Sequence, residues 1–178
     1  MERLARRRST GGMTTTTASA PAPRTLDAAD VVSVIGKRSF CTLGTTSSAG
    51  FSHVAGVLYA AVGTDLWIST HAESRKARNV MANPHVAVCV PVRRLPVGPP
   101  SSVQWQGTAR VVALDDPELV RLHEDGELDA VTSHGELELD GGCFLHVRPR
   151  GRLNTYGIGM SLVSFLRDPL AAAGVVDL

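Results

Sequence analysis

Residues 68–79 read Ile68-Ser69-Thr70-His71-Ala72-Glu73-Ser74-Arg75-Lys76-Ala77-Arg78-Asn79. They begin with the end of an apolar, β-like run, Leu66–Thr70, and pass through a short connection into a segment of helical composition, Glu73–Ala82. Serine is a favourable N-cap residue, so a helix is expected to begin near Ser74. The pair Asn83-Pro84 should end it, because proline disfavours helical geometry in the residue before it. The stretch therefore predicts a strand, a tight connection and a helix start.

The predicted helix start carries an unusual charge. Arg75, Lys76 and Arg78 all lie in its first turns, where a positive side chain opposes the helix dipole and costs roughly 0.3 to 1 kcal/mol. A bound anion would offset that cost. Free backbone N–H groups, the hydroxyls of Ser69 and Thr70 and these cations together resemble a phosphate site. On charge alone, a helix whose cations simply face water fits the same residues equally well.

Around this stretch the chain is predicted to be mostly β, with short helices over residues 26–36 and 115–123. The predicted strands are Phe40–Thr45, Phe51–Ala61, Leu66–Thr70, Val86–Val92, Val103–Leu114 and Cys143–Val147, and Arg152–Tyr156 may extend the last of them. The first three read as an antiparallel meander. An apolar segment, Ser161–Leu166, follows near the C-terminus. Six strands with a few short helices predict a small, mostly-β barrel.

Length and composition predict one soluble domain. With 178 residues, 43% hydrophobic and 20% charged, the chain can bury one core, and no apolar run is long enough to cross a bilayer. Residues 1–25 lack periodic apolar positions and are expected to be a disordered tail before a domain at 26–178; Met13 is an alternative start. The tail also lacks the apolar core of a secretory signal, which predicts a cytoplasmic protein without membrane association.

Charge and motif content exclude several classes of function. Five of the 18 basic side chains and one of the 17 acidic ones precede residue 26, so the predicted domain is slightly acidic and nucleic-acid binding is not expected. Cys41, Cys89 and Cys143 lie in apolar runs without CxxC spacing and are expected to be reduced. The six histidines are scattered, so no metal site is predicted, and motifs of serine hydrolases, Rossmann folds and P-loops are absent.

The strand end Ile68-Ser69-Thr70, the helix start Ser74–Asn79 and the ending Asn83-Pro84 resemble the FMN-binding split barrels related to pyridoxamine 5′-phosphate oxidase. This group includes actinobacterial flavin- and deazaflavin-dependent oxidoreductases. The resemblance covers roughly residues 27–156. It implies a mostly-β fold, a six-stranded antiparallel split β-barrel with a few short helices. It also implies a homodimer with the site at the subunit interface.

The resemblance further implies which residues bind the cofactor. By position, the strand-end residues that contact the ribityl phosphate are Ser69 and Thr70. The helix start supplies a serine and two phosphate-binding cations, which are Ser74, Arg75 and Lys76. The second strand flanks the isoalloxazine ring through the backbone of His53, Val54, Ala55 and Gly56. No catalytic residue is predicted.

The predicted activity is hydride transfer between bound FMN and a small organic substrate, with the protein supplying binding, orientation and exclusion of water. Coenzyme F420 is the alternative cofactor, because both molecules carry a phosphate on a ribityl-type tail. The true oxidase has a glutamine where this chain has Ser102, and its C-terminal substrate motif with Trp and Arg is missing here. Oxidation of pyridoxamine phosphate is therefore not expected. A non-catalytic module that binds flavin, haem or a tetrapyrrole is the alternative function.

Overall fold

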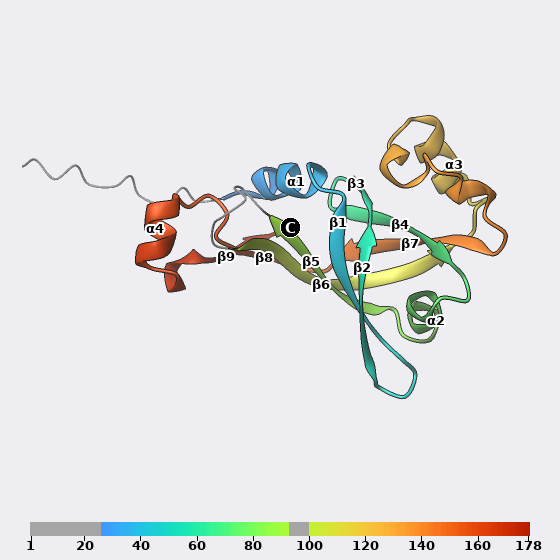
Figure 1. The fold of residues 1–178 in the computed structure, drawn as a ribbon, viewed down its shortest axis with the longest axis horizontal. Helices are drawn as coiled ribbons and strands as arrows, with labels where there is room; N and C mark the ends of the chain where they lie inside the picture. The colour runs from blue at the N-terminus through green and yellow to red at the C-terminus, as the bar shows by residue number, and fades with distance from the viewer. Residues whose placement is uncertain (1–25, 93–99) are drawn as a thin grey trace, which may run out of the picture.

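The fold is seen in a computed structural model that describes residues 26–92 and 100–178 (Figure 1). The predicted tail, residues 1–25, lies outside the described residues. The helices are α1 (Ala28–Gly36), α2 (Arg75–Ala82), α3 (Pro117–Glu124) and α4 (Leu162–Arg167), with single 3-10 turns at Asp129–Val131, Glu136–Glu138 and Leu170–Ala172. The strands are β1 (Phe40–Thr46), β2 (Ser52–Leu58), β3 (Ala60–Val62), β4 (Asp65–His71), β5 (His85–Val92), β6 (Ser101–Val112), β7 (Gly142–Pro149), β8 (Arg152–Tyr156) and β9 (Ala173–Asp177).

The strands form one curled antiparallel sheet in the order β2-β1-β5-β6-β7-β4-β3. The long strand β6 pairs with β5 along one edge and with two strands along the other: Ser102–Gln104 pairs with β8, and Gly107–Val112 pairs with β7. Strand β9 then pairs with β8 and extends the sheet beyond the barrel, toward α4 (Figure 1). This architecture confirms the predicted class, a mostly-β split barrel with a few short helices.

The number of strands differs from the prediction: the described residues form nine, not six. The predicted strand Phe51–Ala61 is two strands, because β2 pairs with β1 and β3 pairs with β4. The break falls at Tyr59, whose amide donates to the Ser39 carbonyl and whose hydroxyl donates to the Ile35 carbonyl at 2.8 Å. Both antiparallel pairings of the predicted meander are therefore present, but the middle strand is divided, and most of β4 pairs with β7.

The C-terminal prediction also needs correction. The stretch Arg152–Tyr156 is a separate strand, β8, rather than an extension of β7. The apolar segment Ser161–Leu166 is mostly helical, because Ser161 caps α4 by accepting a hydrogen bond from the amide of Ser164. The last strand, Ala173–Asp177, was not predicted at all.

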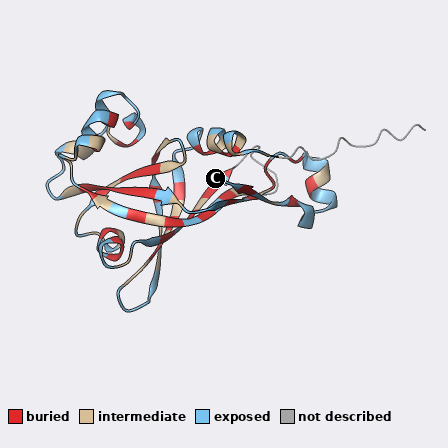
Figure 2. Ribbon diagram, turned by 180° about the vertical axis from the view of Figure 1, so that it is seen from behind, coloured by how far each residue is buried: buried red, intermediate tan, exposed pale blue. Residues whose placement is uncertain are grey.

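The main core lies inside the curl of the sheet. Alternate residues of each strand face inward, as in β1, where the buried positions are Cys41, Leu43 and Thr45. Helix α1 packs against this core through Val31 and Ile35, which are fully buried. Burying an aliphatic side chain of this size contributes about 1.5 to 3 kcal/mol, so the helix is held mainly by these contacts. Figure 2 shows the buried residues concentrated along the strands.

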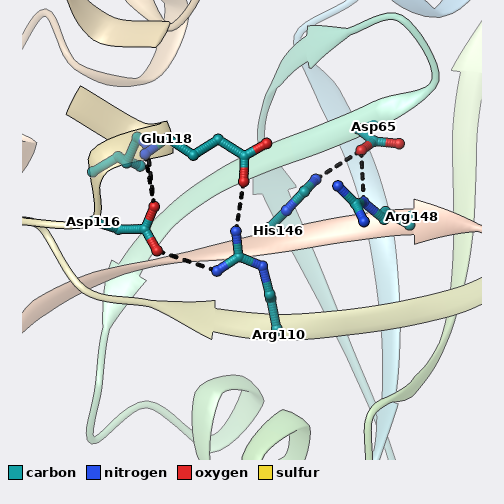
Figure 3. A network of polar contacts seen from close by, with 7 residues as sticks. Asp65, Arg110, Asp116, Glu118, His146 and Arg148 are labelled. Atoms are coloured by element: carbon teal, nitrogen blue, oxygen red, sulfur yellow. Dashed lines mark hydrogen bonds and ion pairs between the residues drawn. The ribbon is translucent and has the colours of Figure 1, made fainter. Parts of the chain in front are cut away.

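A second, smaller core lies between α3 and the sheet. Leu119 and Leu122 of α3 pack with Trp67 of β4 and Phe144 of β7, and all four are buried. Two acidic residues at the start of α3 contact β6 instead: Arg110 lies 3.3 Å from Asp116 and 2.7 Å from Glu118 (Figure 3). The segment around α3 therefore supplies both apolar cover and ion pairs to the sheet.

A polar network beside this second core joins β4 to β7 (Figure 3). The Nε2 atom of His146 lies 2.7 Å from the Oδ2 atom of Asp65, and the Nε–H of Arg148 donates to the same oxygen at 3.0 Å. The His146 ring is buried and stacks on Trp67, with ring centroids 4.1 Å apart. These contacts fix the start of β4, the strand whose other end is part of the predicted site.

Candidate cofactor site

The connection between β4 and α2 is held by two hydroxyl groups. The hydroxyl of Ser74 accepts a hydrogen bond from the amide of Ala77 at 3.3 Å, and the Thr70 hydroxyl donates to Ser74 at 3.1 Å. Ser74 is therefore the N-cap of α2, and the helix begins at Arg75 as predicted. The strand end and the helix start are thus fixed to one another by side-chain contacts.

Two of the cations at this helix start have no acidic partner among the described residues. The first turn of α2 holds no acidic residue, and within residues 26–92 and 100–178 neither Arg75 nor Lys76 forms an ion pair. Arg78 differs, since its guanidinium lies 3.8 Å from the carboxylate of Glu73. Arg75 is exposed and Lys76 is half-buried. Two free cations at the positive end of a helix, beside two hydroxyls, fit a phosphate group.

The Lys76 ammonium lies close to the end of the neighbouring strand. Burial raises the pKa of the Cys143 thiol, and the positive charge of Lys76 opposes that rise. Cys143 is paired with Thr70 in the β4–β7 ladder. The cation, the buried thiol and the strand end therefore occupy the same corner of the barrel.

Helix α2 is tied to the sheet by a buried polar chain. The Asn79 side-chain amide donates to the Thr45 hydroxyl at 3.0 Å, and that oxygen lies 3.5 Å from the Nδ1 atom of His53. A threonine hydroxyl carries one proton, so when it accepts from Asn79 it can donate to Nδ1. Asn79 and Thr45 are both buried, which makes this chain part of the barrel's structure.

The predicted ring-flanking residues lie on β2, beside β1 and near β4. His53 and Ala55 are half-buried, Gly56 is exposed, and Val54 is 66% exposed. The structure thus brings the β2 stretch and the end of β4 to the same side of the barrel, although 12 or more residues separate them in sequence. That these residues bind a cofactor stays a prediction.

A groove of about 480 Å³ opens next to β2. His53 and Val54 line it, whereas none of the predicted residues at the β4–α2 connection does. Its lining residues are Gly44, Thr45, Thr46, Ser52, His53, Val54, His85, Val86, Ala87, Gln106, Gly107 and Arg150. The sequence carries no local signal for this set, because the order β2-β1-β5-β6 and the β7–β8 turn assemble it from distant segments.

Two further searches of the described segments are negative. In residues 26–92 and 100–178, no three histidine, cysteine, aspartate or glutamate side chains are grouped so that they could hold a metal ion. None of the helices in these segments is both long enough and apolar enough to span a membrane.

The comparison with protein families identifies the class. The family model described as pyridoxamine 5′-phosphate oxidase matches residues 28–132, which is more than half of the chain. The chain therefore belongs to the pyridoxamine 5′-phosphate oxidase family. No curated protein sequence matches it.

Solved structures share the fold at low sequence identity. The haem storage protein HutZ from Vibrio cholerae has a TM-score of 0.64 and 17% identity, and the match covers 74% of this chain and 95% of HutZ. A haem-binding protein from Mycobacterium smegmatis has a TM-score of 0.62 and 17% identity, and the match covers 79% of this chain and 56% of that protein. An FAD-binding protein from Mesorhizobium loti has a TM-score of 0.55 and 22% identity, and the match covers 71% of this chain and 92% of that protein. The fold is therefore shared by proteins that bind flavin and by proteins that bind or store haem.

Proposed function

We propose that this protein is an oxidoreductase that binds FMN and transfers a hydride between it and a small organic substrate. The observation that carries the proposal is the pair Arg75 and Lys76 at the start of α2, two cations for which the described part of the chain offers no ion-pair partner, near the Thr70 hydroxyl. Coenzyme F420 is the alternative cofactor, since its phosphate would suit the same cluster. When bound, either cofactor supplies the hydride chemistry.

The protein's own residues bind and orient the cofactor in this proposal. Arg75 and Lys76 bind the phosphate by charge-assisted hydrogen bonds, and the capping contact at Ser74 holds the helix start in place. The backbone of residues 53–56 would flank the ring. The imidazole of His53 lines the adjoining groove, where a ring nitrogen can hydrogen-bond to a bound substrate. Holding the cofactor and the substrate in fixed positions lowers the activation free energy of hydride transfer.

The proposal includes a homodimer. The outward residues of β2 and β1 form an exposed apolar face, with Val54 66%, Leu58 60% and Phe40 45% exposed. An apolar face of this kind on a soluble chain usually marks a partner surface. A second copy related by a two-fold axis would cover it and create two equivalent clefts beside β2. The three cysteines are free, which suits the cytoplasmic location that we also propose.

One observation favours a second candidate function. HutZ and the mycobacterial haem-binding protein have TM-scores above 0.6 with this chain, and two imidazoles, those of His53 and His85, line its groove. Imidazole is a common haem ligand. A non-catalytic module that holds haem, a related tetrapyrrole or a flavin is therefore the alternative.

Spectroscopy and titration separate these functions. The absorption spectrum of the purified protein shows whether it carries a flavin, a deazaflavin or haem, and calorimetric titrations with FMN, F420 and haemin measure each affinity. In the Arg75→Ala/Lys76→Ala double variant we expect FMN affinity to fall by about a hundredfold or more, because each charge-assisted bond is worth roughly 1.5 to 3 kcal/mol. Arg78→Ala is the matched control, since Arg78 already faces Glu73.

The outcomes lead to different conclusions. Unchanged affinity for both FMN and F420 in the double variant would overturn the assignment of the phosphate site. Tight haemin binding without measurable FMN or F420 binding would favour the second function. For a bound flavin, reduction by NADPH followed by reoxidation with a quinone distinguishes an enzyme from a passive binding module.

A further inference from the structure

We propose that the groove beside β2 is a second anion site, which binds the carboxylate or phosphate group of a small molecule. If the proposed function holds, that molecule is the substrate, and the substrate is an organic acid or a phosphorylated compound. The site is distinct from the cluster at Arg75 and Lys76, because the two share no residue.

The composition of the groove favours an anion. Its lining holds one guanidinium, two imidazoles, one side-chain amide and three hydroxyls, and none of its residues is a carboxylate. These polar residues are Arg150, His53, His85, Gln106, Thr45, Thr46 and Ser52. A concave surface lined by donors and one cation, without a negative charge, attracts and orients an oxyanion.

Arg150 is the cation best placed for this role. It lies in the turn between β7 and β8, where its amide donates to the Gln106 carbonyl at 2.9 Å and the following Gly151 has a φ of +77°. Its two neighbours on this hairpin are already paired, Arg148 with Asp65 at 3.0 Å and Arg152 with a carboxylate on β9 at 3.1 Å. Within the described parts of the chain, Arg150 has no acidic partner. A fixed backbone and a free guanidinium suit a ligand-binding arginine.

His53 adds a second polar ring to the groove. Its Nδ1 atom lies 3.5 Å from the Thr45 hydroxyl, which in turn accepts a hydrogen bond from the Asn79 amide at 3.0 Å. These contacts position the imidazole ring at the groove lining. An N–H of this ring can donate to a bound oxyanion.

The groove adjoins the proposed cofactor ring. His53 and Val54 belong both to its lining and to the stretch predicted to flank the ring. A molecule held by Arg150 would therefore lie beside the reactive part of the cofactor, whereas the β4–α2 cluster binds the cofactor's phosphate. Gly44, Val54, Ala87 and Gln106 also lie on the outward sheet face, so the second copy of the proposed dimer would border the groove.

The test uses the full-length, 15N-labelled protein carrying Arg75→Ala and Lys76→Ala, so that the proposed cofactor-phosphate cluster no longer binds the anion. Sodium phosphate and sodium acetate are titrated separately in an anion-poor buffer and followed by amide chemical shifts. We expect saturable shifts at Ser52, Gln106 and Arg150. Adding Arg150→Gln should weaken this binding roughly tenfold, since one charge-assisted contact is lost. The control Arg152→Gln, two residues away and paired outside the groove, should leave the affinity unchanged.

Each result has a defined meaning. Saturation by phosphate alone assigns a phosphate site, and saturation by acetate as well assigns a general carboxylate or phosphate site; both support the proposal. Absence of saturable shifts at the groove, or equal affinity with and without Arg150, overturns it. The spectra themselves show whether each variant is folded. This titration uses no flavin, so failure of the groove and failure of FMN binding are observed independently.

Discussion

The side-chain amide of Asn79, on α2, donates a 3.0 Å hydrogen bond to the hydroxyl of Thr45, on β1, and both side chains are buried. This contact ties the helix that carries the free cations to the first strand of the barrel. The Thr45 hydroxyl also lies 3.5 Å from the Nδ1 atom of His53, which lines the groove. One pair of residues therefore connects the proposed phosphate cluster with the groove.

Replacing Asn79 by alanine tests that connection. We expect the free energy of unfolding to fall by about 1 to 3 kcal/mol, because the Thr45 hydroxyl loses a buried partner. Urea denaturation followed by circular dichroism measures the change. The control is Met81→Ala on the same helix, where the side chain is 61% exposed and an effect within about 0.5 kcal/mol is expected. Equal stability of the two variants would contradict the proposed importance of the contact.

Gly107 allows a test of the close contact between β6 and β7, where it pairs with Pro149. A Cβ atom at this position would lie 2.0 Å from the carbonyl oxygen of Arg148, so Gly107→Ala must push the two strands apart. We expect a severe loss of stability, on the order of 3 kcal/mol or more, seen as a lower thermal midpoint. Gly36→Ala, where nothing lies within 4 Å, should be neutral or slightly stabilising. Similar midpoints for the two variants would show that the strands tolerate a side chain here.

Stability should decrease at alkaline pH. Burial, with a smaller contribution from Cys89, raises the pKa of Cys41 from 9.0 to about 12, and burial also raises the pKa of Tyr59 well above its ordinary value. Below pH 9 these groups are protonated in both the folded and the unfolded chain. As the pH rises from about 9 toward 12, the unfolded chain loses protons that the folded chain retains, so the free energy of unfolding falls.

Urea denaturation between pH 7 and 11 measures this dependence. Each such group contributes a slope of up to about 1.4 kcal/mol per pH unit. The variant Cys41→Ala should show a shallower decline above pH 9 than the unaltered protein. A stability that stayed constant up to pH 11 would contradict the raised pKa values.

The exposed apolar face gives a prediction about assembly. Leu58→Asp places a charge on the outward side of β2 and should convert the proposed dimer into a folded monomer, detected by sedimentation at micromolar concentration. Val120→Asp, on the exposed side of α3, is the control and should leave the dimer intact. A monomer for the unaltered protein, with cofactor bound tightly, would exclude a site that needs both subunits.

Local signals in the sequence were sufficient for the elements around the predicted site. Ser74 was expected to start a helix and does so, because capping depends only on residues a few positions apart. The break at Tyr59 could not be predicted in this way. The apolar pattern continues through it, and only the pairing of β2 with β1 and of β3 with β4 separates the two strands. Strand pairing of this kind depends on residues far apart in sequence.

Local sequence signals were also insufficient to predict the groove as a functional site. His53 was identified through the family resemblance, but Arg150 and His85 carry no motif and were not predicted. They approach one another only because β5 and β6 lie side by side and the β7–β8 turn returns to β6. An arginine in a turn is usually solvated, so only the neighbours of Arg150 in the fold indicate a binding role for it.

The junction at Tyr59 also shapes how the barrel is closed. The sheet begins with β2 and ends with β3, so its two outermost strands are consecutive in the chain and meet through one residue. One bent segment therefore closes the barrel: its first part, β2, pairs with β1, and its last part, β3, pairs with β4. The junction at Tyr59 is held from both sides by these ladders and by its own hydrogen bonds to Ser39 and Ile35. A change of the bend at this one residue would therefore turn β2, with its predicted ring-flanking residues, relative to β4.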